Sequence, residues 1–214
     1  MEQREILSAR HLNAGALRAR FAAHRPGLRS FDTEQVRGDH TLDPDAKIPP
    51  GLRPAAVLVA LVERPEGLFV LLTQRHADLT AHAGQIALPG GRIEPDDADA
   101  VDAALRETEE EIGLPRAQLE VIGRLDTYIT GTGFQIVPVV ALVIPPFTIK
   151  PDAREVTEVF EVPLAFIVNQ ENHRRETREL KNGRRTFYVL PYEKRYIWGA
   201  TAGMLVNLAE VLTR

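Results

Sequence analysis

Three glutamates, Glu107, Glu110 and Glu111, are spaced so that their side chains could act together on phosphate groups. Residues three and four positions apart share one face of a helix. Carboxylate oxygens are ligands for Mg²⁺, which usually keeps waters and substrate phosphates in its remaining positions. The spacing therefore predicts a divalent-cation site for phosphate chemistry. For three glutamates alone, the alternative is a solvated acidic face on a surface helix.

A helix over residues 98–112 must position these glutamates. Apolar or buried-type residues recur at helical spacing on a different face of it, at Val101, Ala104, Leu105, Thr108 and Ile112. Asp96 or Asp97 is expected to cap the first turn, Asp99 suits the positive start of the helix, and Gly113 is placed to end it. The sequence thus predicts both boundaries of the element.

The last turn of this helix breaks a local rule. Glu109, Glu110 and Glu111 place negative charge at the negative end of the helix dipole, where each costs about 0.3 to 1 kcal/mol if exposed and unpaired. Asp102 and Arg106 form a favourable four-residue pair, which leaves the glutamates uncompensated within the helix. Such a violation often marks a functional site.

The surroundings of the glutamates match a known family. Gly90 and Gly91 allow a sharp turn and a close approach of the backbone to a ligand, and the guanidinium of Arg106 can hold carboxylates in register. Together the stretch resembles the signature of the Nudix hydrolases. The matching residues are Gly91, Asp97, Arg106, Glu107, Glu110, Glu111, Gly113 and Leu114. It departs from the pattern in having Asp97 where glutamate is usual and one extra residue between Gly91 and Arg106.

The resemblance implies an α/β fold, a Nudix-type α/β/α sandwich with a mixed β-sheet. It also implies Mg²⁺ or Mn²⁺ held by Glu107, Glu110 and Glu111, with Asp97 either reaching an ion or serving as a helix cap. Arg106 is expected to brace the carboxylates. The general base is left open among Glu107, Glu111 and the downstream Glu155, since a base must lie within reach of the attacking water.

The composition fits one globular domain with an N-terminal addition. The chain has 214 residues, 44% hydrophobic and 26% charged, which suggests residues 1–54 as a helix and extended segment before a domain at 55–214. A net charge of -4 argues against nucleic acid or an anionic membrane as a partner bound by bulk electrostatics. The absence of cysteine excludes disulfides and thiol nucleophiles. Without a signal-peptide core or a long apolar run, we expect a cytoplasmic protein.

The remaining elements are predicted from periodicity and turn residues. A helix is expected over residues 5–24, and a draped segment, or instead a dimer arm, over residues 25–54. Pro138 suggests a bulge or an edge position. Strands are expected at 55–63 and 68–75 as a hairpin in the middle of the sheet, at 118–128 and 134–144 around the TGTG loop (residues 130–133), and at 155–162. A hairpin at 178–190 and a helix at 198–213 complete the chain.

A narrower resemblance lies just before the glycines. The stretch LLTQRHADLTAHAGQIALPGG is similar to the second signature of the coenzyme A pyrophosphatase branch, and the likeness extends from about residue 55 to the C-terminus. That branch also carries the longer box with Asp at its first acidic position, as at Asp97. The chain departs from the branch at His76, Thr80 and Leu88, where a small residue, Arg and Phe are usual.

Several substrate contacts follow as expectations from this second resemblance. Arg75, His82 or Arg92 can replace the basic residue lost at Thr80, while Gly90 and Gly91 bring the backbone near the phosphates. For His82 the alternative is a histidine hydrogen-bonded beside the loop. The TGTG loop is expected to be a plain turn rather than a gate. The basic pairs at 174–175 and 184–185 are expected to be solvated hairpin faces rather than a binding site.

The implied reaction splits coenzyme A or a derivative into adenosine 3',5'-bisphosphate and the 4'-phosphopantetheine portion. One alternative keeps the chemistry but acts on ADP-ribose or another nucleoside diphosphate derivative. A second alternative is a non-catalytic Nudix module that binds a nucleotide and regulates a partner. The expected partner is thus a small-molecule diphosphate, and family habit suggests a homodimer.

Overall fold

The computed structural model describes residues 12–24, 36–43, 46–78, 82–180 and 183–213. Its helices are α1 (Ala14–Ala23), α2 (Ala100–Ile112), α3 (Leu164–Val168) and α4 (Gly199–Thr213), with 3-10 turns η3 (Asp39–Thr41), η4 (Arg116–Gln118) and η5 (Gln170–Asn172). Its strands are β1 (Arg37–Gly38), β2 (Arg53–Arg64), β3 (Gly67–Arg75), β4 (Ile86–Ala87), β5 (Gly90–Arg92), β6 (Leu119–Arg124), β7 (Tyr128–Ile129), β8 (Phe134–Val143), β9 (Val156–Pro163), β10 (Arg174–Leu180), β11 (Gly183–Tyr192) and β12 (Arg195–Trp198).

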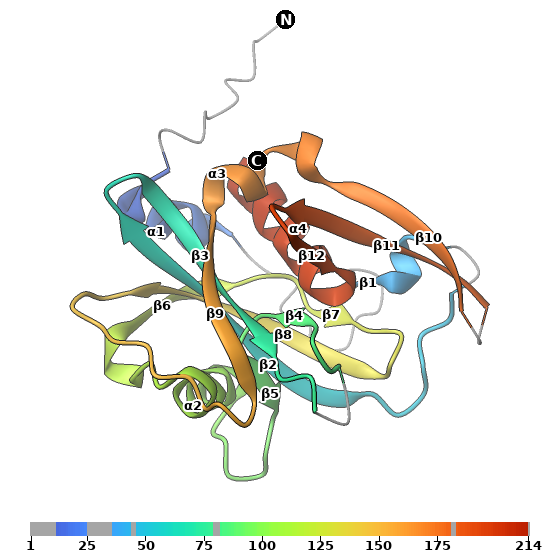
Figure 1. The fold of residues 1–214 in the computed structure, drawn as a ribbon, viewed down its shortest axis with the longest axis horizontal. Helices are drawn as coiled ribbons and strands as arrows, with labels where there is room; N and C mark the ends of the chain where they lie inside the picture. The colour runs from blue at the N-terminus through green and yellow to red at the C-terminus, as the bar shows by residue number, and fades with distance from the viewer. Residues whose placement is uncertain (1–11, 25–35, 44–45, 79–81, 181–182, 214) are drawn as a thin grey trace, which may run out of the picture.

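The main sheet is mixed and is centred on β2 (Figure 1). Its strands run in the order β1-β7-β8-β2-β3-β4, while β5 pairs with β2, β6 with β8 and β9 with β3. Strand β2 is antiparallel to β3 and parallel to β8, so the hairpin predicted for residues 55–75 is confirmed in the middle of the sheet. The predicted C-terminal hairpin is β10 with β11, whose turn residues 181–182 lie outside the described part of the chain.

Different helices pack against the two faces of β2. Its residues Ala56, Leu58, Ala60 and Val62 share one apolar cluster with Ala103, Ala104 and Ile112 of α2. The alternating residues Val57, Val59 and Leu61 share the other cluster with α4, α3 and α1. Because successive strand residues point to opposite faces, a run of apolar residues produces a strand covered on both sides. The predicted α/β/α sandwich with a mixed sheet is confirmed.

Helix α1 is shorter than the sequence predicts. It begins at Ala14, because the side chain of Asn13 accepts a hydrogen bond from the Ala16 N–H at 2.9 Å and so caps the first turn. The part of the prediction that covers residues 5–11 lies outside the described residues. Leu17 and Phe21, one turn apart, are both buried as their spacing suggests.

Of the two positions expected for Pro138, a bulge or an edge, the edge is wrong. The pairing of β6 with β8 does have a register shift, but it lies opposite Val140 and Ala141 rather than opposite Pro138. Strand β8 has β2 on one side and β6 and β7 on the other. The Pro138 carbonyl accepts from the N–H of Leu125, at the gap where β6 has ended and β7 has not begun. The missing N–H of Pro138 faces that same gap, so no ladder hydrogen bond is lost.

An arginine of the N-terminal segment forms an ion pair with the C-terminal helix, in addition to the apolar packing of α1. Arg37 of β1 donates to Asp126 at 2.8 Å and also to Glu210 of α4. Asn207 of α4, which is 1% exposed, donates to the same Asp126 carboxylate and accepts from the Asp126 N–H, both at 3.0 Å. The division of the chain at residue 54 stays a prediction.

Within the described residues, no helix has the length and apolar character needed to cross a membrane.

Candidate active site

Helix α2 presents the three glutamates, and its ends are set by Asp99 and Gly113. The Asp99 side chain accepts from the N–H groups of Val101 at 2.7 Å and Asp102 at 3.0 Å. The expectation that Asp96 or Asp97 caps the helix is therefore wrong, and Asp99 takes that role. Gly113 ends the helix as predicted, in the left-handed conformation with a φ of 66°.

Arg106 braces the acidic side chains, as expected. It donates two parallel hydrogen bonds to Asp97, at 2.8 and 2.9 Å, and single ones to Glu107 at 3.0 Å and Glu110 at 3.1 Å. This two-pronged contact with Arg106, together with the Glu94 N–H, lowers the pKa of Asp97 to about 2. Arg106 is itself a residue of α2, so the expectation that Glu107 and Glu110 are uncompensated within the helix is wrong.

The predicted pairing of Asp102 with Arg106 is wrong. Asp102 instead pairs with Arg116 and accepts from the Ala98 N–H at 3.0 Å. Arg106 binds Asp97 rather than Asp102, because the Asp97 carboxylate is only 3% exposed and offers both oxygens to the guanidinium. Since both oxygens of Asp97 are engaged, its proposed contact with an ion requires this pair to open.

Glu107 lies directly against the glycine loop. A Cβ atom on Gly91 would overlap the Glu107 carboxyl group, and one on Gly90 would overlap the backbone of β2. The two glycines are thus required for close packing, and not only for a tight turn. Burial raises the pKa of Glu107 against the opposing effect of Arg106, and the charges of Glu110 and Glu155 raise it further.

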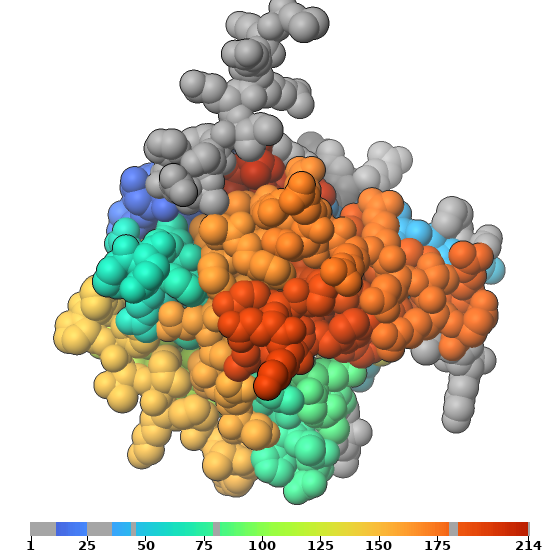
Figure 2. Space-filling view, turned by 45° about the horizontal axis from the view of Figure 1, so that its top comes forward, coloured from blue at the N-terminus to red at the C-terminus, as the bar shows by residue number. Residues whose placement is uncertain are grey.

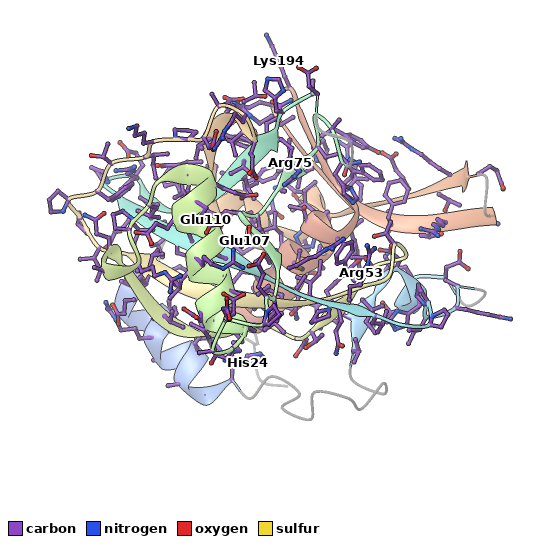
Figure 3. All side chains as sticks on the ribbon, turned by 90° about the horizontal axis from the view of Figure 1, so that it is seen from below. His24, Arg53, Arg75, Glu107, Glu110 and Lys194 are labelled. Atoms are coloured by element: carbon purple, nitrogen blue, oxygen red, sulfur yellow. The ribbon has the colours of Figure 1, made fainter. Side chains whose placement is uncertain are left out.

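Glu111 is the buried member of the cluster. It is 3% exposed, and its carboxylate accepts from the Gly90 N–H at 3.2 Å and from Arg75 Nη1 at 3.3 Å. Burial is the main reason that its pKa rises to about 7, while Gly90 and Arg75 oppose the rise. Figure 3 shows Glu107 and Glu110 on α2, with Arg75 on the neighbouring strand β3.

Glu155 joins the cluster from the loop before β9. Its carbonyl accepts from the His76 N–H at 2.7 Å, next to the end of β3, and its charge raises the pKa of both Glu107 and Glu111. Glu110 is the most open of the helix carboxylates, with a side chain 60% exposed. The structure thus brings the predicted acidic residues together from two segments.

The donor set fits a hard divalent cation. Its groups are carboxylate oxygens. Burial raises the pKa of Glu107 and Glu111, and the charges of neighbouring glutamates add to the rise, so an added positive charge would favour the ionised forms. As the side chains are arranged, the described residues contain no group of three that already forms an ion-binding cluster. Arg106 and Arg75 hold these carboxylates instead.

The candidate substrate contacts are placed differently from one another. Arg75 reaches Glu111, and Arg92 is exposed with its guanidinium 5.9 Å from the centre of the Phe134 ring. His82 is exposed and contacts Gln85 at 2.9 Å, an arrangement that agrees with the alternative of a histidine hydrogen-bonded beside the loop. Thr80 lies outside the described residues.

Two residues near the site were not predicted. The guanidinium of Arg53 stacks on the Phe134 ring at 3.9 Å, and the Arg92 guanidinium lies near the same ring. The Arg92 carbonyl in turn accepts from Arg106 at 3.2 Å, which connects this pair to the carboxylates. The only signal in the sequence was an aromatic residue directly after the TGTG loop.

Comparisons with known proteins agree with this geometry. The sequence profile described as "NUDIX domain" matches residues 52–186. The chain is 41% identical over 158 residues to "Uncharacterized Nudix hydrolase NudL" of Escherichia coli strain K12, covering 73% of this chain and 81% of that protein. The protein of the same description from Shigella boydii serotype 18 is 40% identical over the same shares of both chains.

Solved structures include the "Crystal Structure of a C. elegans Ap4A Hydrolase Binary Complex", which is 24% identical. Its match covers 53% of this chain and 81% of that chain, with a TM-score of 0.44. Nudix hydrolases generally need divalent metal ions such as Mg²⁺ or Mn²⁺. On the profile match and the bacterial relatives, the chain belongs to the Nudix family and is a Nudix hydrolase.

Proposed function

We propose that this Nudix hydrolase cleaves the diphosphate bond of coenzyme A or its derivatives, giving adenosine 3',5'-bisphosphate and the 4'-phosphopantetheine portion. The observation that carries the proposal is the environment of Glu111. Its buried carboxylate is held by Arg75 and by the Gly90 N–H, near the two ends of the stretch 71–91 that resembles the coenzyme A pyrophosphatase branch. Two residues of the branch-like stretch thus hold a proposed metal ligand, which supports the coenzyme A assignment.

Mg²⁺ or Mn²⁺ would be held by Glu107, Glu110 and Glu111, and would supply charge neutralisation at the diphosphate. The protein's own part is to position the groups. Arg106 fixes the directions of Glu107 and Glu110, while Gly91 lets the loop backbone lie against Glu107. Arg75 and Arg92 supply positive charge toward the phosphate oxygens.

In the proposed reaction, the oxygen of a water molecule bonds to one phosphorus as the bridging P–O bond of the diphosphate breaks. The bond pair stays on the leaving phosphate, and the water proton passes to a general base. Glu155 suits this role best, because Arg106 holds Glu107, and Arg75 with the Gly90 N–H holds Glu111. Among the described residues, no hydrogen bond holds the Glu155 carboxylate, and its side chain is exposed.

A substrate panel tests the proposal. Pure protein with Mg²⁺ or Mn²⁺ would be incubated in ¹⁸O-water with coenzyme A, acetyl-coenzyme A or ADP-ribose. The products would be identified by mass spectrometry. We expect coenzyme A substrates to give the highest kcat/KM, with ¹⁸O in one of the two products. Preferential cleavage of ADP-ribose would replace the coenzyme A assignment, and absence of turnover on every substrate would favour a non-catalytic nucleotide-binding module.

A further inference from the structure

A cavity of about 680 Å³ lies between three segments that are far apart in the sequence. Its described walls are residues 39–43 and 46–49 around η3, the TGTG loop after β7, and the start of β11. Its polar lining includes Asp39, His40, Asp43, Lys47, Thr130, Arg184 and Arg185. Figure 1 shows η3 next to β11, and in Figure 2 the light-blue N-terminal segment lies beside the orange hairpin.

The described lining of the cavity holds three side chains with a permanent positive charge, Lys47, Arg184 and Arg185, and two carboxylates, Asp39 and Asp43. Lys47 and Arg184 are exposed and form no ion pair with any other described residue, and Arg185 donates only to the Gly131 carbonyl, at 3.5 Å. The Asp39 oxygens are occupied by the Tyr128 hydroxyl at 2.8 Å and the Gly131 N–H at 3.1 Å. Asp43 also has a partner. In a chain of net charge -4, this local basic excess suits an anion.

A continuous line of contacts joins the cavity to the carboxylates. Gly131 lines the cavity, and the next residue of the loop, Thr132, accepts from Arg53 through its carbonyl at 2.9 Å. Arg53 stacks on Phe134, which also lies near Arg92, and the Arg92 carbonyl accepts from Arg106. In Figure 3, Arg53 lies between α2 and the projecting hairpin. Along this line of contacts, Arg53, Phe134 and Arg92 lie between the cavity lining and the carboxylates.

We propose that the cavity binds a phosphate monoester on the nucleoside ribose of the substrate while the diphosphate lies at the glutamates. The inference rests on the proposed function, because it requires a nucleoside diphosphate derivative at that site. Arg184 and Arg185 donate to the phosphate oxygens, and Lys47 adds charge. A phosphate monoester carries about -1.5 to -2 at pH 7, which is the group that such a set recognises.

The structure thereby separates two arginine pairs that the sequence does not distinguish. Arg174 and Arg175 on β10 are exposed, as expected for a solvated hairpin face, and do not line the cavity. Arg184 and Arg185 lie on the paired strand and line it. The first pair is therefore a matched control, since R174Q/R175Q removes the same charge from the same hairpin as R184Q/R185Q.

Calorimetric binding of adenosine 3',5'-bisphosphate and of AMP, measured in EDTA, tests the proposal without turnover. We expect the wild-type chain and R174Q/R175Q to bind the bisphosphate about tenfold or more tightly than AMP. In R184Q/R185Q the two affinities should become equal, with unchanged circular dichroism. The proposal is overturned if the wild type shows no preference, or if R184Q/R185Q keeps the preference in full.

This binding test and the substrate panel fail independently. A bisphosphate preference that depends on Arg184 and Arg185 would support the cavity even if coenzyme A were not hydrolysed. Hydrolysis of coenzyme A without that preference would support the proposed function and show that the cavity takes no part in substrate binding.

Discussion

Replacing Glu111 with glutamine should stabilise the metal-free protein while abolishing its turnover. Glu111 is 3% exposed, and burial raises its pKa from 4.5 to about 7. At a pH well above 7 the buried carboxyl group must ionise. The raised pKa then lowers the free energy of unfolding by about 3 kcal/mol. Glutamine has nearly the same shape, needs no ionisation and still offers an acceptor to the Gly90 N–H, although its amide faces Arg75. We therefore expect a net gain of about 1 to 3 kcal/mol in the free energy of unfolding at about pH 8.

The expected pH dependence has a definite sign. Between pH 4.5 and about 7 the folded chain keeps a proton on Glu111 that the unfolded chain has released. The Glu111 contribution to the stability of the metal-free wild type therefore falls as the pH rises through this window, and the variant lacks that contribution. At about pH 4 the Glu111 carboxyl group is largely neutral in both the folded and the unfolded wild type. The difference in stability between the wild type and the variant should therefore nearly vanish.

Urea unfolding in EDTA at about pH 4, 6 and 8, followed by circular dichroism, measures both effects. Glu109→Gln is the matched control, because Glu109 lies on the same turn of α2 but is exposed and faces Arg116 at 3.5 Å. Addition of Mg²⁺ should stabilise the wild type and the control more than Glu111→Gln. The reasoning would be refuted if Glu111→Gln were no more stable than the wild type at pH 8, or if both had the same pH dependence.

Three further changes separate chemistry from packing. Glu110→Gln should lower Mg²⁺-dependent kcat/KM about 100-fold or more with an unchanged fold, whereas Glu109→Gln should stay within about twofold, as initial rates would show. Gly91→Ala should displace the Glu107 carboxyl and lower kcat about tenfold or more. A fall in thermal stability without a change in kcat would contradict this. Asn207→Leu should lower the free energy of unfolding in urea by about 1 to 3 kcal/mol, because the Asp126 N–H loses its acceptor. The metal dependence of turnover should be retained.

The sequence predicted best what depends on local periodicity. Helix α2 was recognisable from its apolar spacing and from Gly113, whose lack of a side chain suits the left-handed position that ends a helix. The hairpin at the centre of the sheet was recognisable because apolar residues on both faces indicate a strand covered on both sides.

The errors arose where a partner comes from outside the local pattern. A four-residue rule selected Asp102 for Arg106, because it considers only residues on the helix. Asp97, in the loop before the helix, offers two oxygens in a nearly buried position and takes the guanidinium instead. The Arg75 contact with Glu111 spans 36 residues, and no spacing rule reaches that far. The cavity was equally out of reach, since its walls meet only in the folded chain.

The link between Arg37, Asp126 and α4 bears on how this protein can be shortened. The family match covers residues 52–186, which include all of the acidic residues proposed to act in catalysis. A fragment trimmed to that span would lose Arg37 and Asn207 together, and with them both side chains that hold the Asp126 carboxylate. Strand β7 would also lose its parallel neighbour β1. An expression fragment or a domain transplant should therefore carry both flanks, because segments outside the family match hold Asp126 and β7 in place.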